Sequence, residues 1–369
     1  MTYINLRNSG FLEFSHKLPR NMSTVVYSKS IWNENPIFYF IFKRAYFVMI
    51  TPLYSLAHYC VLRRSPKNFE SLKWFLYFHV FCTTIEWFCA WFLIDIYDFE
   101  PSIVLRIDGV LRYFVDSVLL FRVFSVVEDV SSISALFLFC NRLIIIVNMA
   151  RRQKSVLRQF SELLLYSFAF VFCLWSLPFT LSAVPENQQL AKKIIIETFQ
   201  TEQYYPDCPM EPNAVVVSSP VTESENFAAE IEIASWVVIG LAIIVSAKIS
   251  YSFLERRTKN NMSEVTKKMN KKFSQRTVFQ ALIYVTFAAV PYTILYLSIL
   301  FRIRIYELAY LIDFFSENHP TACIVSIFLF YDPYQQFLLK ILKFRFAKKN
   351  ASKLSSEFSG QDRTTITKI

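Results

Sequence analysis

The chain has 369 residues, of which 54% are hydrophobic, 17% aromatic and 18% charged, and its formal net charge is +10. A soluble domain of this size usually carries about a quarter charged residues, and here several apolar runs are too long for the core helices of a soluble protein. The positive charge does not indicate nucleic-acid binding, because the basic residues lie in short runs between the apolar segments, as in the cytoplasmic loops of membrane proteins.

The first 44 residues precede the first apolar segment. The first thirty residues lack the short apolar region and the small-residue cleavage site of a signal peptide, so the first span is expected to act as its own insertion signal. Within this segment, Asn21-Met22-Ser23 forms a sequon for N-glycosylation.

Seven apolar segments follow, and each is long enough to cross a bilayer as a helix, which takes roughly 20 residues. The third segment is the most interrupted, since Arg122, Glu128 and Asp129 lie within it. The sequence therefore predicts an all-α membrane protein whose seven-transmembrane helix bundle occupies residues 45–342. The predicted spans are about 45–62, 74–97, 116–147, 160–184, 233–254, 278–301 and 320–342.

The distribution of Lys and Arg predicts the orientation of the bundle. Basic residues gather after the first and third spans, in the loop 255–277 and in the tail 343–369, and a seven-span count puts all four segments on the cytoplasmic side. The loop 185–232 has two lysines and nine acids, which is typical of an extracellular loop. The segment 1–44 is then extracellular and Asn21 is available for glycosylation. One observation opposes this orientation: the N-terminal segment is itself basic through Arg7, Lys17, Arg20, Lys29, Lys43 and Arg44.

Three classes of membrane protein compete at this point: receptors, transporters and channels. Transporters commonly show internal repeats and Gly- or Pro-broken helices, but no repeat relates the two halves and only Gly240 lies well inside a span. The ionisable residues within the spans are too scattered to predict an ion pathway. The four histidines fit no metal-ligand spacing and no Gly-rich phosphate loop occurs, so we expect neither an enzyme nor a cofactor. A long basic third cytoplasmic loop and prolines in the late spans favour a receptor, and a ligand-gated channel or small-solute transporter remains the alternative.

Particular residues carry a family likeness. They are, in chain order, Ser65-Pro66-Lys67-Asn68-Phe69 with Leu72-Lys73-Trp74-Phe75-Leu76 and His79; Asn141-Arg142; Phe279-Gln280-Ala281-Leu282-Ile283 with Pro291; and His319-Pro320, Ser326 and Pro333-Tyr334. In this order and spacing, the sequence resembles the nematode serpentine chemoreceptors of the Srh and Sri families, within the larger Str group. It departs from their pattern at Cys140, where these families have an acidic residue, and at Gln335, where they have Arg.

The resemblance implies a G-protein-coupled receptor for small chemical cues in the plasma membrane of sensory neurons, often in their cilia. The implied partners are a small-molecule ligand, a heterotrimeric G protein and the lipid bilayer, without nucleic acid; the oligomeric state stays open. The sequence does not identify the ligand or the G protein.

Two groups of residues are candidates for the switch that couples to a G protein. The first is Asn141 and Arg142 near the inner end of span three, where Arg142 either pairs internally at rest or extends toward the lipid headgroups. The second is Asp332, Pro333 and Tyr334 near the inner end of span seven, where Pro333 is either a hinge or an ordinary helix-end proline with an interfacial aromatic beside it.

Candidates for a ligand pocket lie in the second, fourth and sixth spans, and they are Glu86, Trp87, Trp91, Trp175, Tyr292 and Tyr296. Ligand pockets are mostly apolar and aromatic, but Trp and Tyr also form the aromatic belts of membrane proteins at this depth, so both interpretations stay open. Cys208 is a candidate for an extracellular disulfide, with Cys89 or Cys323 as its partner.

Overall fold

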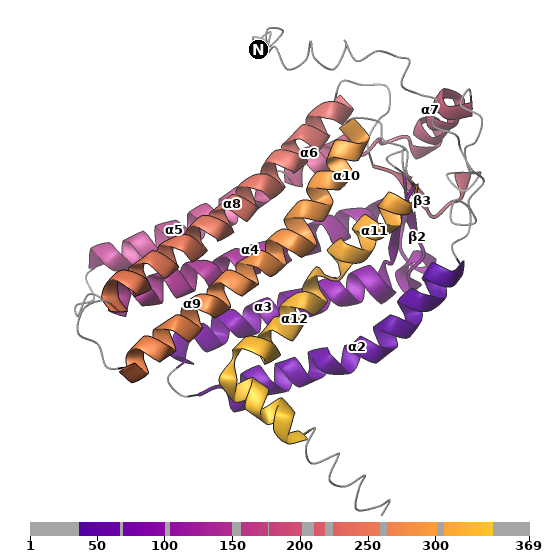
Figure 1. Ribbon diagram of the computed structural model, residues 1–369. Coiled ribbons are helices and arrows are strands. Elements are labelled where there is room, and N and C mark those ends of the chain that lie inside the picture. The colour runs from indigo at the N-terminus through magenta and orange to yellow at the C-terminus, as the bar shows by residue number, and fades with distance from the viewer. Residues whose placement is uncertain are drawn as a thin grey trace, which may run out of the picture.

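The protein folds as a bundle of long helices with a small sheet at one end (Figure 1). The computed structural model describes residues 37–66, 69–99, 104–149, 156–175, 177–200, 210–217, 224–258, 264–300 and 306–341. The helices of the first half are α2 (Ile37–Arg64), α3 (Glu70–Phe88) with the π-helical turn η3 (Cys89–Leu93), α4 (Ser117–Met149), α5 (Val156–Leu174) and α6 (Leu177–Ala183). Those of the second half are α8 (Ser224–Thr258), α9 (Glu264–Tyr284), the π-helical turn η6 (Val285–Ala289), α10 (Val290–Leu300), α11 (Tyr306–Glu317) and α12 (His319–Phe330).

Five helices in the described part of the chain are long and apolar enough to cross a membrane, and a bent pair makes a sixth if it is counted as one span. These helices are Ile37–Arg64, Leu72–Leu93, Ser117–Ile146, Ala234–Arg256 and Lys271–Leu295, and the bent pair is Tyr310–Phe330 with Asp332–Ile341. The predicted fourth span, 160–184, corresponds to α5 and α6. Large apolar side chains on the outer faces of the bundle, such as Phe38 and Val171, are exposed as they are when lipid is the solvent.

Charged residues do not interrupt the helices where the sequence suggested. α4 continues through Arg122, Glu128 and Asp129 without a break, over the range of the predicted third span. α2 begins at Ile37, before the predicted first span, and includes Lys43. The helix can accommodate this lysine because its side chain is only 1% exposed and points into the bundle rather than toward lipid.

The sheet closes one end of the bundle. β1 (Ile96–Phe99), β2 (Val104–Ile107) and β3 (Ala214–Val216) pair antiparallel in that order, with Ile96 opposite Ile107 and Val104 opposite Val216. The first two strands connect α3 to α4, and the third belongs to the loop before α8. The helix α7 (Gln188–Gln200) is fastened to the sheet because the Gln188 amide exchanges two hydrogen bonds with the Val216 backbone, of 2.8 and 3.0 Å. We call this the sheet end of the bundle.

The connection from α3 into the sheet needs a close approach of two backbones. The Gly109 N–H donates to the Ile94 carbonyl at 2.7 Å, and a Cβ on Gly109 would lie 2.2 Å from the Leu93 carbonyl oxygen. Only glycine fits there. Asp95, between η3 and β1, has φ +54, a left-handed conformation that Asp tolerates better than most residues.

At the opposite end, which we call the tail end, the chain turns sharply after α12. Tyr331 adopts an extended conformation, and the helix Asp332–Ile341 runs at 90° to the preceding one (Figure 1). The predicted seventh span, 320–342, therefore does not correspond to one helix. The bundle element is α11 with α12, residues 306–330, and the segment after it leaves the bundle axis.

Candidate functional site

Arg142 lies at the centre of a cluster at the tail end. Although a guanidinium is costly to bury, the side chain is only 2% exposed, so it turns into the bundle and does not extend toward the headgroups. Its Nη2 donates a hydrogen bond to the hydroxyl of Tyr331, and its guanidinium lies 5.7 Å from the ring centre of Phe139 and 5.8 Å from that of Tyr331. The Nη1 of Arg142 has no hydrogen-bond partner among the described residues. α4 is thus held to the turn after α12 through one charged side chain.

Tyr334 joins the same turn to α2. Its hydroxyl lies 2.6 Å from Ser65 Oγ, and its ring centre lies 5.6 Å from that of Tyr331. Pro333 occupies the first turn of the helix Asp332–Ile341, where its missing N–H costs no helical hydrogen bond. The predicted residues Pro333 and Tyr334 therefore shape the turn that presents Tyr331 to Arg142.

Asp332 connects the turn to α9. Its carboxylate lies 2.8 Å from Arg276 Nη2 and 3.4 Å from Lys272 Nζ. Partial burial acts to raise the pKa of Asp332, but the two cations outweigh it and the pKa falls below its usual range. The side chain is 45% exposed, so this pair is screened by solvent and contributes specificity more than stability. The guanidinium of Arg276 also lies 5.8 Å from the Tyr331 ring centre, so α4 and α9 meet the same tyrosine.

Asn141, the neighbour of Arg142 in sequence, points to a different helix. Its Nδ2 donates a 3.3 Å hydrogen bond to the Tyr166 hydroxyl of α5. It therefore fastens α4 to α5 and lies outside the Arg142–Tyr331 contact.

A set of polar side chains runs through the middle of the bundle. Glu86 Oε1 lies 3.9 Å from His319 Nδ1, and His319 Nε2 lies 3.4 Å from Cys323 Sγ. The ring of Tyr284 meets the His319 ring edge to face, with centres 5.2 Å apart. Glu86 thus has a basic partner on α12, which the sequence did not reveal because 233 positions separate the two residues.

A small internal cavity lies next to this set. Its volume of about 20 Å³ is enough for one water molecule. His79, Gln280, Tyr284 and Ser326 supply its polar lining, with Gln280 Nε2 donating to Ser326 Oγ at 3.2 Å and His79 Nδ1 lying 2.9 Å from Ser134 Oγ. The space in this cavity suits water.

The aromatic residues predicted to line a pocket divide into separate groups. Trp87 and Trp91 stack on each other with ring centres 4.8 Å apart. Tyr292 instead stacks on Trp236 at 4.3 Å and donates a hydrogen bond to Glu128. Trp175 is exposed, with Phe179 6.3 Å away, and the side chain of Tyr296 lies outside the described part of the structure. Among the described side chains, these candidates therefore pack in separate groups, and the ligand pocket stays a prediction.

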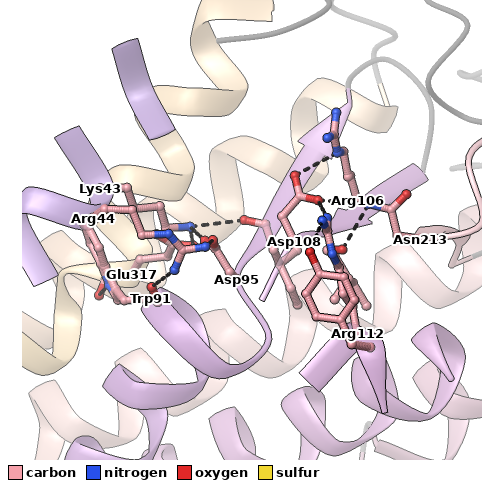
Figure 2. A network of polar contacts seen from close by, with 12 residues as sticks. Lys43, Arg44, Trp91, Asp95, Arg106, Asp108, Arg112, Asn213 and Glu317 are labelled. Carbon is pink, nitrogen blue, oxygen red and sulfur yellow. Dashed lines mark hydrogen bonds and ion pairs between the residues drawn. The ribbon is translucent and has the colours of Figure 1, made fainter. Parts of the chain in front are cut away.

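The sheet end carries a buried ion-pair network that joins three helices (Figure 2). Lys43 Nζ of α2 lies 2.9 Å from Asp95 Oδ1 and 2.6 Å from Glu317 Oε1. Arg44 pairs with the other oxygen of Asp95 and donates to the Trp91 carbonyl at 2.9 Å. The Lys43 ammonium is also flanked by aromatic rings, with the centre of Tyr97 4.4 Å away. Lys43 is thus buried and paired with acidic side chains, while Arg44 is paired with Asp95 but 42% exposed. This pairing lowers the weight of both among the flanking positive charges that opposed the predicted orientation.

A second charged cluster fastens the sheet to the loop that contains β3 (Figure 2). Asp108 accepts hydrogen bonds from Arg112 and, at 2.9 Å, from Asn213 Nδ2. Arg106 Nε lies 2.8 Å from the other oxygen of Asp108. Sequence reasoning did not identify this cluster. The signal that could have found it is the alternation of basic and acidic residues at Arg106, Asp108 and Arg112, between the second and third predicted spans.

Two predicted sites cannot be placed. Asn21 and Cys208 lie outside the described residues, while Cys89 and Cys323, the suggested partners of Cys208, are buried free thiols.

The long apolar helices with inward-facing charges define a multi-pass membrane protein. The family model of the serpentine type 7TM GPCR chemoreceptor Srh matches residues 34–344, and the chain belongs to that family of seven-transmembrane chemoreceptors. The predicted resemblance to Srh is confirmed, and with it the class: a membrane receptor family rather than a family of enzymes. No curated protein matches the chain.

Proposed function

We propose that this protein is a G-protein-coupled chemosensory receptor that detects a small-molecule cue and signals to a heterotrimeric G protein. The observation that supports this most directly is the buried guanidinium of Arg142, held by the hydroxyl of Tyr331 at the point where the chain leaves the bundle. Among the described residues, Tyr331 is the neutral partner that holds this buried cation, and either a movement of α12 or a new anionic partner for Arg142 can change the contact.

The tail end has the parts that a switch needs. Arg142 on α4 and Arg276 on α9 meet at Tyr331, and Asp332 holds α9 to the start of the next helix. An outward movement of α9 breaks the exposed Arg276–Asp332 pair and opens the surface around Arg142. The free energy for this movement comes from the difference in ligand affinity between the two arrangements.

The orientation that fits this function places the sheet end outside the cell and the tail end inside. It follows from the basic loop 255–277 and the basic tail 343–369, together with the internal pairing of Lys43 and Arg44. We propose the plasma membrane, and in a sensory neuron the cilium, as its location.

Glycosylation tests this orientation directly. Translated into microsomes, the chain is expected to gain one glycan that Asn21→Gln removes and that Asn261→Gln leaves in place, because Asn261 lies in the basic loop predicted to be cytoplasmic. A glycan on Asn261 and none on Asn21 would invert the orientation.

Ligand-dependent signalling tests the function itself. In cells that express the full chain with a calcium or cyclic-nucleotide reporter, a screen of small volatile and water-soluble compounds is expected to give an agonist. Arg142→Ala is then expected to lower agonist potency by at least about tenfold, at unchanged surface expression. The control Lys193→Ala, on the exposed face of α7, is expected to leave the response intact.

The opposite result has a clear meaning. An agonist-evoked current that persists without G protein would favour a ligand-gated channel, the alternative class. An unchanged response in Arg142→Ala would refute the role assigned to that residue.

A further inference from the structure

A cleft opens at the sheet end beside the Asp108 cluster. It has a volume of about 510 Å³, within the range of small-molecule sites. Its walls come from β2, from the short helix η4 (Val110–Tyr113) with the start of α4, and from the loop before β3. The described residues that line it include Arg106, Arg112, Tyr113, Asp116, Glu211 and Asn213.

The two guanidiniums in this cleft share one strongly held counterion. Asp108 is mostly buried and is contacted by both Arg106 and Arg112, and its Oδ1 also accepts from Asn213. Arg106 Nε lies 2.8 Å from Asp108 without the alignment of a hydrogen bond. The two arginines therefore keep donor capacity after Asp108 is counted. Asp116 also lines the cleft, but its Oδ2 accepts hydrogen bonds from the N–H groups of Val118 and Leu119 at the start of α4.

The second counterion is loosely held. Glu211 Oε2 lies 3.6 Å from Arg106 Nε, which is beyond hydrogen-bond distance, and its side chain is 44% exposed. An exposed pair at this separation contributes little. A ligand carboxylate that binds Arg106 more tightly than Glu211 does can therefore take the position of the Glu211 carboxylate. The exposed ring of Tyr113 and the side chains of Val115 and Pro212 supply apolar surface in the same cleft.

We infer that this cleft binds a small organic carboxylate, an acid group on a compact apolar body, which displaces Glu211 from Arg106 and pairs with the two guanidiniums. Arginine is well suited to this, because its planar set of N–H donors matches both oxygens of a carboxylate. The inference rests on the proposed function, since it names the chemical class of the cue.

The cleft is joined to the helix bundle by a short backbone route. The N–H of Asp108 donates to the carbonyl of Asp95 at 2.9 Å, and the side chain of Asp95 holds Lys43 and Arg44. Lys43 in turn holds Glu317 at the end of α11. A ligand that pulls on Arg106 and Asp108 therefore acts on residues that contact α2 and α11.

Binding is tested on the purified full-length receptor in detergent, with benzoate as the probe and thermal unfolding as the readout. Benzoate is expected to raise the melting temperature of the wild type, while the uncharged benzamide is not. Glu211→Gln is expected to lower the benzoate concentration for half of the effect by about fivefold, because it removes the competing carboxylate, and Arg106→Gln to raise it by about tenfold. Lys193→Gln, on the exposed face of α7, serves as the matched surface control.

The Glu211→Gln variant makes the test decisive even if Arg106→Gln does not fold. A structural role for Glu211 predicts no gain in affinity, and only a competing role predicts one. No benzoate shift in either the wild type or Glu211→Gln would overturn the inference, as would an equal shift with benzamide or with inorganic phosphate. Because no G protein is present, failure here is separate from failure of the proposed function, which the cell reporter tests.

Discussion

The structural role of Lys43 depends on partners that are distant in sequence. In the sequence it is a basic residue flanking a span, which shortened the predicted first span to 45–62. In the structure it is buried between Asp95 and Glu317, which lie 52 and 274 positions later. A buried cation with two carboxylates has its desolvation offset only while both partners remain in place. No periodicity in the sequence identifies such partners.

Replacing this one cation is expected to destabilise the sheet end. Lys43→Met leaves Glu317 without its ammonium and Asp95 with Arg44 alone, and breaking a buried ion pair usually costs about 3–5 kcal/mol. The variant is therefore expected to unfold at a clearly lower temperature in a thermal melt of the purified receptor. The double variant Lys43→Met with Glu317→Gln is expected to recover part of the loss, because it also removes a carboxylate that Lys43 neutralises in the wild type.

The matched control is Lys193→Met, on the exposed face of α7, which is expected to change the melting temperature little. If Lys43→Met melts with the wild type, or if the double variant is no more stable than the single one, the network does not hold the three helices together.

At the scale of elements, apolar length predicted the helices well and the connections poorly. α4 covers the predicted third span despite its charges, because Glu128 accepts a hydrogen bond from Tyr292 of α10. The strands were not predicted. Each has only three or four residues, and β3 pairs with a strand about 110 positions earlier, so neither length nor alternation gave a usable signal.

The turn after α12 illustrates a local signal that was interpreted incompletely. Proline is favoured in the first turn of a helix, as Pro333 is here, and Tyr331, two residues before it, leaves the helical conformation with ψ 105. The sequence left open whether Pro333 is a hinge within span seven or a helix-end proline, and the structure has a 90° turn at this position that ends the bundle element. The direction of the helix Asp332–Ile341 depends on Tyr334 reaching Ser65, a contact 269 positions apart.

For the molecule as a whole, the sequence predicted the membrane bundle and the receptor family, and the match over residues 34–344 confirms the family. Of the predicted switch residues, Arg142 and the segment Asp332–Tyr334 meet at the tail end, while Asn141 points to α5. Tyr331, which completes the contact, was missed because a tyrosine next to an acidic residue has no distinctive pattern. The described aromatic candidates for the ligand pocket pack in separate groups, Trp87 on Trp91 and Tyr292 on Trp236, and their role in ligand binding stays a prediction.

The central claim, that Arg142 and Tyr331 form the resting contact of a G-protein-coupled receptor, is tested most directly by nucleotide exchange without ligand. With the purified receptor in lipid nanodiscs and a heterotrimeric G protein, Tyr331→Phe keeps the ring but removes the hydroxyl that accepts from Arg142. Because a hydrogen bond to a charged group contributes about 1.5–3 kcal/mol, basal exchange is expected to rise about tenfold, and Arg142→Ala in the same background is expected to abolish the increase. Basal exchange equal to the wild type in Tyr331→Phe, or an increase that persists without Arg142, would contradict the account.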